Sequence, residues 1–308
     1  MTSTATAERP SGRTSPEPSR ALAYAAVALV VTSWSSAFVV LRYLHDQFDP
    51  FTLSLGRTSI ALLVLVALSL FARNGDPWLP RGRKEWTLVL VCGIGWFFAY
   101  HVALNFAVRY IDAGTSSILV NIGPLLIIAF AIVFFGEKTR WNLFLGAAVS
   151  FTGILLIGLA SADTAQIDWK GVVLCLLAAL LWSVGSMTQK PLFSSASALR
   201  VTVWTTAVGV LAALPFSAAS ADLSSVTPAG WGMLVYLGVV PTAIGFAAWA
   251  YAMSKLKASN LGTFTYLVPP LAILMGWVFL GELPPWMALA GSAICLAGVI
   301  IAKYERKA

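Results

Sequence analysis

The stretch "NIGPLLIIAFAIVFFGEK", from Asn121 to Lys138, decides the fold. It is almost entirely apolar, yet a proline lies near its start and a Gly-Glu-Lys cluster ends it. The stretch "YLVPPLAILMGWVFLGEL", from Tyr266 to Leu283, repeats this plan 145 residues later. Because proline removes a helical hydrogen bond and can bend a helix, each stretch predicts an apolar helix with a break near its start and a polar end.

The composition places this chain in lipid. Of its 308 residues, 58% are hydrophobic and 11% are charged, and its mean hydropathy is +0.82. A soluble domain carries about 25% charged residues, so the chain has too few polar groups to cover a surface that faces water. The net charge of +7 comes from basic residues between apolar runs. We therefore interpret these residues as topology signals and expect no nucleic-acid partner.

The apolar runs predict an all-α integral membrane protein. A spanning helix needs about 20 mostly apolar residues, and backbone groups in lipid must pair within the segment. Alternating polarity, which a membrane barrel requires, is absent. We predict ten transmembrane helices, at roughly 21–43, 51–72, 86–109, 114–135, 141–161, 170–189, 198–218, 231–253, 259–280 and 285–303.

The basic residues predict the orientation. With both termini in the cytoplasm, most of the 20 lysines and arginines lie in cytoplasmic segments. The outer segments then keep Arg42, Arg109 and Lys170, and Arg57 lies inside a span. This distribution follows the positive-inside rule. We expect a multi-pass protein of the bacterial plasma membrane, with cytoplasmic tails at 1–20 and 304–308.

An internal repeat connects the two opening stretches. Residues 86–158 align without a gap with 231–303, and further upstream Trp34-Ser35 pairs with Trp182-Ser183, 148 residues apart. We predict two repeats of five helices each, at 21–162 and 168–303. Because five is odd, the second copy is inverted in the membrane, and inverted repeats predict alternating access to a central site.

These features resemble the EamA family of the drug/metabolite transporter superfamily. The marks are ten spans in two repeats and a fourth helix in each that contains proline and ends in Gly-Glu: Pro124 with Gly136-Glu137, and Pro269 with Gly281-Glu282. The resemblance implies a bacterial inner-membrane carrier, often an exporter of amino acids, other metabolites or drugs. It also implies a central cavity between helices 1–4 and 6–9, with helices 5 and 10 peripheral.

Arg57 is the strongest candidate for the site. It is the one formal charge that lies away from the ends of a predicted span, about 10 Å from the outer end of the second helix at 1.5 Å per residue. Charge inside a membrane is costly and usually functional. The guanidinium either faces the pathway, where it binds a carboxylate or holds helices together, or reaches outward to the interface.

Other polar residues within spans form a second group of candidates. His101 and Asn105 share a helix face, as do Ser117 and Asn121, because each pair is four residues apart. Such groups either line a wet cavity or join helices by hydrogen bonds. Asn121 and its twin Tyr266 each precede a proline, which suggests opposite walls of one cavity. Two further candidates are Trp182 and Thr263.

The prolines and glutamates of the repeated motif are candidate hinges and gates. Pro124, Pro269 and Pro270 either form hinges or make static kinks. Glu137 and Glu282 lie too near helix ends to carry protons through the membrane centre. We expect each to pair with a loop cation or a backbone N–H, acting as a gate or a staple.

Glycines seven residues apart mark the last helix of each repeat. Gly146 and Gly153, and their twins Gly291 and Gly298, lie two turns apart on one helix face. Small residues at this spacing allow close approach of helices. We favour internal packing, and a homodimer is the alternative.

The remaining inferences concern function. The chain has no phosphate-binding GxxxxGK[ST] loop, and its three cysteines have no metal-binding spacing, so we expect no cofactor, no metal and no ATPase subunit. The leading hypothesis is a secondary transporter that exports a small organic solute such as an amino acid. A multidrug or aromatic cation exporter is the alternative within transport, and an intramembrane enzyme or a membrane scaffold is the alternative outside it. With no acid in mid-membrane, ion coupling would fall to His101, or transport is downhill.

Overall fold

The structure is a computed structural model, and it describes residues 17–72, 75–110, 116, 119–137, 140–161, 168–217, 223–224, 226–280 and 286–303. Within these ranges all regular structure is helical. Ser117, Glu282, residues 1–16 and residues 304–308 lie outside them, so the expectations for these residues stay predictions.

The first half of the described chain runs from α1 to α7. Its elements are α1 (Glu17–Leu44), α2 (Pro50–Ala72), α3 (Gly82–Cys92), the π-helix η1 (Gly93–Tyr100), α4 (His101–Tyr110), α6 (Gly123–Phe135) and α7 (Trp141–Ser161). Local sequence explains their starts. Before α2, the carboxylate of Asp49 accepts hydrogen bonds from the N–H groups of Phe51 and Thr52, while Pro50 occupies the first turn, where no donor is needed.

The second half repeats this series. Its elements are α8 (Trp169–Gln189), η3 (Lys190–Ser194), α9 (Ala198–Ser217), α10 (Pro228–Leu237), the π-helix η4 (Gly238–Ile244), α11 (Gly245–Lys255), α12 (Ala258–Phe264), η5 (Thr265–Leu267), α13 (Val268–Leu280) and α14 (Trp286–Lys303). Asp168 and Thr227 cap α8 and α10 by accepting hydrogen bonds from backbone N–H groups.

The chain is a multi-pass membrane protein. By length and composition, seven helices of the described chain can cross a membrane: Ala21–Leu41, Pro50–Ala72, Gly82–Tyr110, Trp169–Ser194, Ala198–Ser217, Pro228–Lys255 and Ala258–Phe279. Three apolar helices are shorter: Gly123–Phe135, Trp141–Ile157 and Trp286–Ala302. The ten predicted spans correspond to these seven and three together, and the count of ten stays a prediction.

The sequence repeat is visible in the structure. The helices α6 and α13 begin and end 145 residues apart, and both π-helices begin at twin glycines, Gly93 and Gly238. Contacts between repeats are also twinned: Ser35 Oγ lies 3.1 Å from Val268 O, and Ser183 Oγ lies 3.0 Å from Gly123 O. Two related halves therefore exchange equivalent contacts.

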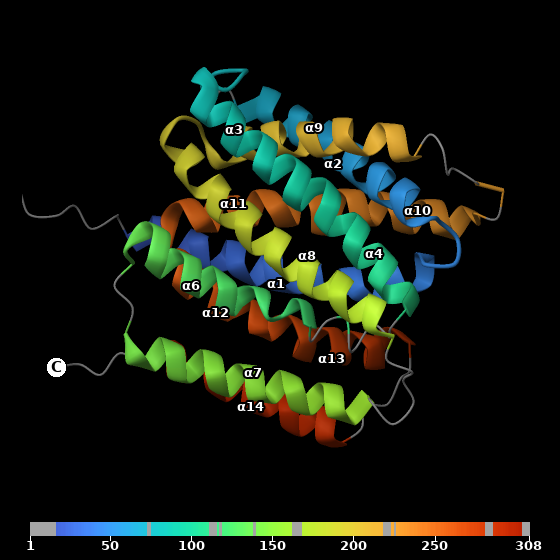
Figure 1. The fold of residues 1–308 in the computed structure, drawn as a ribbon, viewed down its shortest axis with the longest axis vertical. Helices are drawn as coiled ribbons and strands as arrows, with labels where there is room; N and C mark the ends of the chain where they lie inside the picture. Colours follow the sequence, from blue (N-terminus) through green and yellow to red (C-terminus); the bar gives the residue numbers. More distant parts are fainter. Residues whose placement is uncertain are drawn as a thin grey trace, which may run out of the picture.

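The helices α7 and α14 lie side by side along one side of the bundle (Figure 1). Gly146 faces Gly298 and Gly153 faces Gly291, and a Cβ added at Gly146 would lie 2.4 Å from the carbonyl oxygen of Gly298. Twin helices that pair in this order run antiparallel, as an inverted repeat requires. The glycines thus serve internal packing, as the sequence predicts, and dimerisation stays a prediction.

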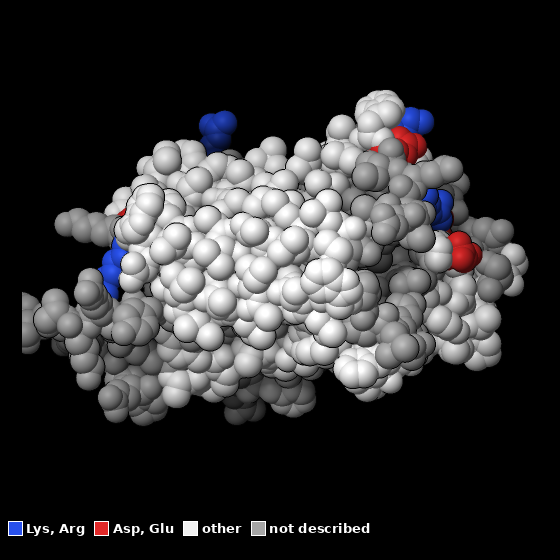
Figure 2. Space-filling view, turned by 90° about the horizontal axis from the view of Figure 1, so that it is seen from below, with Lys and Arg blue, Asp and Glu red and all other residues white. Residues whose placement is uncertain are grey.

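The outer face of this helix pair is apolar. Figure 2 shows a broad face without charge, and the Lys, Arg, Asp and Glu side chains in view lie at its margins. Trp141 and Trp286, twins at the starts of α7 and α14, are 76% and 75% exposed. Tryptophan favours the membrane–water interface, so this face is suited to contact with lipid.

Candidate solute-binding cavity

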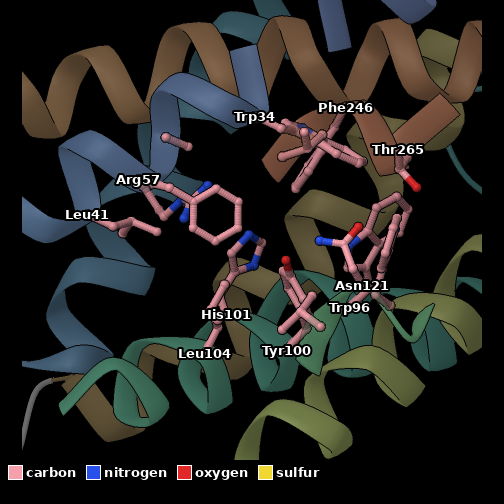
Figure 3. Close-up of a pocket in the computed structure, with 15 residues that line it drawn as sticks. Trp34, Leu41, Arg57, Trp96, Tyr100, His101, Leu104, Asn121, Phe246 and Thr265 are labelled. Atoms are coloured by element: carbon pink, nitrogen blue, oxygen red, sulfur yellow. The ribbon is translucent and has the colours of Figure 1, made fainter. Parts of the chain in front are cut away.

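A cavity lies among α1, α2, η1, α4, α8, α11 and the starts of α6 and α13. It has a volume of about 60 Å³, which is room for a few water molecules. Figure 3 shows the side chains of Arg57, Tyr100, His101 and Asn121 directed toward a common space. Elements from both repeats contribute to this space, so the cavity depends on how the two halves pack.

Arg57 lies on α2, is only 5% exposed, and reaches across the repeat boundary. Its Nε and Nη2 donate hydrogen bonds of 3.1 and 3.0 Å to Thr242 Oγ1 on η4. The Thr242 hydroxyl in turn donates to Leu237 O at 2.6 Å, which fixes its lone pairs toward the guanidinium. The rest of the planar fork remains directed into the cavity, where it is suited to a carboxylate.

The π-helix η4 explains why Thr242 reaches Arg57. Pro241 lies inside this element and has no N–H to donate. The carbonyl oxygen of Pro241 accepts a hydrogen bond from Trp34 Nε1 at 3.2 Å. π-helical turns are rare, but they occur frequently at functional sites. Here the turn holds Thr242 against Arg57 and the preceding residue, Pro241, against the cavity residue Trp34.

His101 begins α4 beside Arg57. Its Nδ1 lies 3.1 Å from Phe97 O, and because a carbonyl oxygen can only accept, Nδ1 carries the proton. The other ring nitrogen, Nε2, is buried and has no hydrogen-bond partner among the described residues. In the neutral ring it is an acceptor, so the cavity offers a cationic donor and a neutral acceptor close together.

Aromatic rings form much of the cavity wall. Trp34 contacts its twin Trp182 edge-on with ring centroids 5.9 Å apart, and it also contacts Phe246 at 5.7 Å. Trp96 and Phe246 lie 5.1 Å apart. The twin tryptophans meet where the repeats meet, so both halves of the molecule contribute to the aromatic part of the wall.

The structure separates the predicted site residues into two groups. Arg57, His101, Asn121 and Trp182 line the cavity together. The others that are described do not. Asn105 donates to Pro50 O and Ser54 Oγ, Tyr266 is fully buried elsewhere in the core, and Thr263 lies 3.3 Å from Ser259 O on its own helix.

The prolines of the repeated motif lie in first turns. Pro124 is in the first turn of α6, and Pro269 and Pro270 follow Val268 at the start of α13. A turn at 121–122 and the 3-10 turn η5 precede them. Proline costs little at a helix start, so these residues mark where each helix begins again after a break beside the cavity.

The first Gly-Glu motif closes one end of the bundle. Gly136 has φ +57°, a left-handed conformation that glycine adopts without strain, and it ends α6 so that Glu137 lies beyond the helix. The Glu137 carboxylate accepts hydrogen bonds from Lys190, from the backbone N–H groups of Ala258 and Ser259, and from the Ser259 hydroxyl.

This set of contacts, the Glu137 clasp, joins the end of α6, the start of η3 and the start of α12. A carboxylate at a helix N-terminus pairs with free N–H groups and with the positive end of the helix dipole. Burial raises the pKa of Glu137, but the hydrogen bonds from Lys190 and Ser259 outweigh burial and hold its pKa below the ordinary value. The carboxylate is therefore charged at neutral pH. These are the kinds of partner, a cation and backbone N–H groups, that the sequence predicts for Glu137.

Among the described residues, no group of three or more His, Cys, Asp or Glu side chains could hold a metal ion. Sequence reasoning missed Thr265, Trp34 and Phe246 as cavity residues. It also missed Thr242 as the hydrogen-bond partner of Arg57. A mid-span proline followed by threonine, in "GVVPTAIG", is the signal that could have found Thr242. The Trp34–Trp182 twin pair could have found the first tryptophan.

The fold and cavity define a helical membrane transporter, and comparison with known proteins identifies its family. The model of the EamA-like transporter family matches residues 21–159 and 169–304, so the chain belongs to this family. The chain is 35% identical to a probable terminal-alkyne amino-acid exporter of Streptantibioticus cattleyicolor, over 90% of this chain and 91% of that protein.

More distant relatives agree. A probable amino-acid metabolite efflux pump of Salmonella typhimurium is 24% identical, over 89% of this chain and 92% of that protein. The uncharacterized transporter YdfC of Bacillus subtilis is 27% identical over 88% of each chain. A solved crystal structure with 24% identity superposes with a TM-score of 0.77, covering 94% of this chain and 98% of that one, which shows the fold alone.

Proposed function

We propose that this protein is a secondary transporter that exports a small amino-acid-like solute across the bacterial plasma membrane. The observation that carries the proposal is the buried, oriented guanidinium of Arg57 in a cavity whose wall includes a cluster of aromatic rings. The fork would bind the carboxylate of the solute, while ring faces, which attract cations, would receive its ammonium group. The printed names of two relatives, an amino-acid exporter and an amino-acid metabolite efflux pump, support this solute class.

Transport would proceed by alternating access. Arg57, His101 and Asn121 are all buried, so helices must move to admit a solute to them. The breaks before Pro124 and Pro269 lie beside the cavity and are candidate hinges. The Glu137 clasp is the candidate cytoplasmic gate, because it ties the end of a first-repeat helix to the start of a second-repeat helix.

An exporter of aromatic cations is the second candidate. The cluster of Trp34, Trp96, Trp182 and Phe246 favours it, because quaternary ammonium groups bind in aromatic cages. Arg57 opposes it, since its charge lies at the same cavity and would repel a cation. The two candidates thus differ in the charge of the group that must meet Arg57.

Counterflow in proteoliposomes tests the proposal. Proteoliposomes that contain the wild-type protein would be loaded with a radiolabelled amino acid. They would then be exposed to a panel of amino acids, their carboxamides and aromatic quaternary cations. We expect amino acids to compete at least tenfold better than the matched carboxamides, since a charged hydrogen-bond pair is worth about 1.5–3 kcal/mol. Equal competition by carboxamides, or stronger competition by cations, would favour the second candidate. Absence of any flux would favour the alternatives outside transport, an intramembrane enzyme or a membrane scaffold.

The orientation is tested separately. Ser224 lies between α9 and α10, in a segment that the distribution of basic residues predicts to be outside the cell. A cysteine at this position should react with an impermeant thiol reagent in intact cells. Reaction only after the membrane is permeabilised would invert the orientation. The native cysteines, Cys92, Cys175 and Cys295, are buried and give a low background.

A further inference from the structure

Three polar side chains follow one face of α4 away from the cavity. His101, Asn105 and Arg109 are each four residues apart, and residues at this spacing lie above one another on a helix. At 1.5 Å per residue, each step rises about 6 Å and the three together about 12 Å. The series begins at the cavity beside Arg57 and ends at an exposed arginine near the end of α4.

Two further spaces accompany this face. A narrow gap of about 10 Å³ is lined by Leu41, His45, Asn105 and Arg109. Beyond it, an open hollow of about 400 Å³ is lined by His45, Asp46, Val108 and Arg109. Leu41 is a wall of both the cavity and the gap, while His45 and Arg109 are walls of both the gap and the hollow. The three spaces therefore follow one another between α1 and α4.

The polar groups along this series suit a zwitterionic solute, which carries both an ammonium group and a carboxylate. Asn105 is 4% exposed, and its Nδ2 is held by Pro50 O at 3.1 Å and Ser54 Oγ at 3.0 Å. Its Oδ1 is buried and has no hydrogen-bond partner among the described residues. An unpaired acceptor in this position suits an ammonium group. Arg109, held by its bond of 3.2 Å to Phe48 O, supplies a positive charge at the mouth that suits a carboxylate.

We propose that the face of α4 bearing Asn105 and Arg109 is the exit route to the outer side, and that these two residues form a second, transient binding station for an α-amino acid. The ammonium group meets Asn105 Oδ1 and the carboxylate meets Arg109 after leaving Arg57. Leu41 is the narrow point between the two stations. This inference rests on the proposed function for its solute and orientation, but the route itself can be tested without any solute.

The first test measures access and charge with two small thiol reagents, an anionic sulfonatoethyl and a cationic trimethylammonium-ethyl methanethiosulfonate. We expect Val108→Cys, in the hollow, to react from outside, and Phe106→Cys, packed against Phe51 on α2, to stay protected. In Val108→Cys, adding Arg109→Gln should slow the anionic reagent and speed the cationic one about fivefold each, the effect of one charge near 4 Å in water, so that the anion-to-cation rate ratio falls roughly 25-fold. An unreactive Val108→Cys, or an unchanged ratio, would overturn the proposal.

The second test separates this station from the central site. Equilibrium binding of a labelled amino acid to detergent-purified protein should be lost in Arg57→Ala and unchanged, within about twofold, in Arg109→Gln. Efflux from proteoliposomes should nevertheless slow several-fold in Arg109→Gln and recover in Arg109→Lys. Normal efflux in Arg109→Gln would show that Arg109 does not form a second binding station. Absence of binding by the wild type would instead contradict the proposed function and leave the access result standing.

Discussion

Twin residues of the two repeats make equivalent contacts at the periphery of the molecule, between α7 and α14, but polar twins differ at the central cavity. Where α7 meets α14, twin residues make equivalent contacts: Ser150 Oγ donates to Cys295 O at 3.1 Å, and Cys295 Sγ donates to Ser150 O at 3.2 Å, from positions 145 residues apart. At the cavity the twin tryptophans Trp34 and Trp182 match, but the polar residues do not, since Asn121 has Tyr266 as its twin. The symmetric part maintains the inverted architecture, whereas the asymmetric part is where the chemistry of a solute can be specified.

The packing around the two π-helices shows which residues are twins at the centre. A Cβ added at Gly93 would meet Val208 Cβ at 2.6 Å, and one at Gly238 would meet Ile60 Cβ at the same distance. Those partners are 148 residues apart, so the twin of Arg57 is Thr205. Thr205 Oγ1 lies 3.0 Å from Val201 O of its own helix. One half of the centre thus carries a cation that crosses the repeats, and the other half carries a hydroxyl satisfied locally.

Replacing Arg57 should give the largest effect. We expect Arg57→Ala to reduce counterflow by roughly 10- to 150-fold, since a charged hydrogen bond contributes about 1.5–3 kcal/mol. Arg57→Lys should restore part of the activity, because lysine lacks the planar fork. The matched control is Thr205→Ala, which should transport nearly as well as wild type. Equal losses in the two twins would show that the centre is not functionally asymmetric.

Breaking the Glu137 clasp should have the next largest effect. Glu137→Gln should lower the free energy of unfolding in detergent by about 1.5–3 kcal/mol, the value of hydrogen bonds to a charged group. The pKa of Glu137 is lowered by folding, so its stabilisation is full above the ordinary carboxyl pKa and is lost as pH falls through the folded value. The melting temperature of wild type should therefore fall below about pH 4.5 more steeply than that of the variant.

A matched control is available for this pH profile. Asp46 has a side chain that is 84% exposed, so Asp46→Asn should retain the acid sensitivity of wild type. Identical pH profiles of the melting temperature for wild type, Glu137→Gln and Asp46→Asn would show that the Glu137 clasp does not stabilise the fold. A clasp that acts as a gate also predicts that Glu137→Gln changes the balance of inward and outward reactivity at cavity cysteines.

Adding a methyl group at the symmetric interface should affect both twins equally. A Cβ at Gly153 would lie 2.5 Å from Gly291 O, and one at Gly291 would lie 2.5 Å from Gly153 O. Such overpacking typically costs about 1–3 kcal/mol. Gly153→Ala and Gly291→Ala should therefore lower the melting temperature by similar amounts. Gly232→Ala is the control, because a Cβ there meets nothing within 4 Å. A large difference between the twins would contradict the symmetry of the periphery.

Removing the hydroxyl that orients Arg57 should have a smaller effect at the centre. Thr242→Val keeps the shape of the side chain but loses the acceptor of Arg57 Nε and Nη2. A hydrogen bond from a charged group contributes about 1.5–3 kcal/mol. Because Thr242→Val leaves the charge of Arg57 in place for the solute, only part of this should be lost from transport, and counterflow should weaken roughly two- to tenfold with normal insertion. The control is Thr205→Val, at the twin of Arg57. A silent Thr242→Val would show that Arg57 needs no orienting partner.

Much of this arrangement could be predicted from the sequence, for physical reasons that concern single helices. The repeat, the breaks before Pro124 and Pro269, and the glycine contacts follow from residue spacing. Arg57, His101, Asn121 and Trp182 were recognised because polar or matched aromatic residues stand out in apolar spans. The structure brings these four to one cavity.

The missed features depend on how helices pack against one another. The Arg57–Thr242 bond joins residues 185 apart in sequence and requires a π-helix that periodicity does not reveal. Tyr266 is the twin of Asn121, yet Thr265 lines the cavity in its place because the chain passes through the 3-10 turn η5 there. Sequence symmetry predicts which backbones correspond. It does not predict which side chain on each backbone faces the cavity.

The smallest expected effect tests the symmetry most finely. Ser150→Ala and Cys295→Ala each remove one member of the reciprocal pair between α7 and α14. Hydrogen bonds between membrane helices contribute about 0.6 kcal/mol on average and at most about 1.7, and thiols donate more weakly than hydroxyls. We therefore expect Ser150→Ala to cost about 0.6 kcal/mol and Cys295→Ala a similar amount, composed of a weaker hydrogen bond and a lost buried sulfur.

Counterflow should be unchanged in both variants, because neither residue lines the cavity. Cys295→Ser separates the two contributions, since it keeps a donor at nearly the same place and should recover most of the loss. Reduced transport with unchanged stability in any of these variants would mean that the α7–α14 pair takes part in the transport cycle and is not a static support.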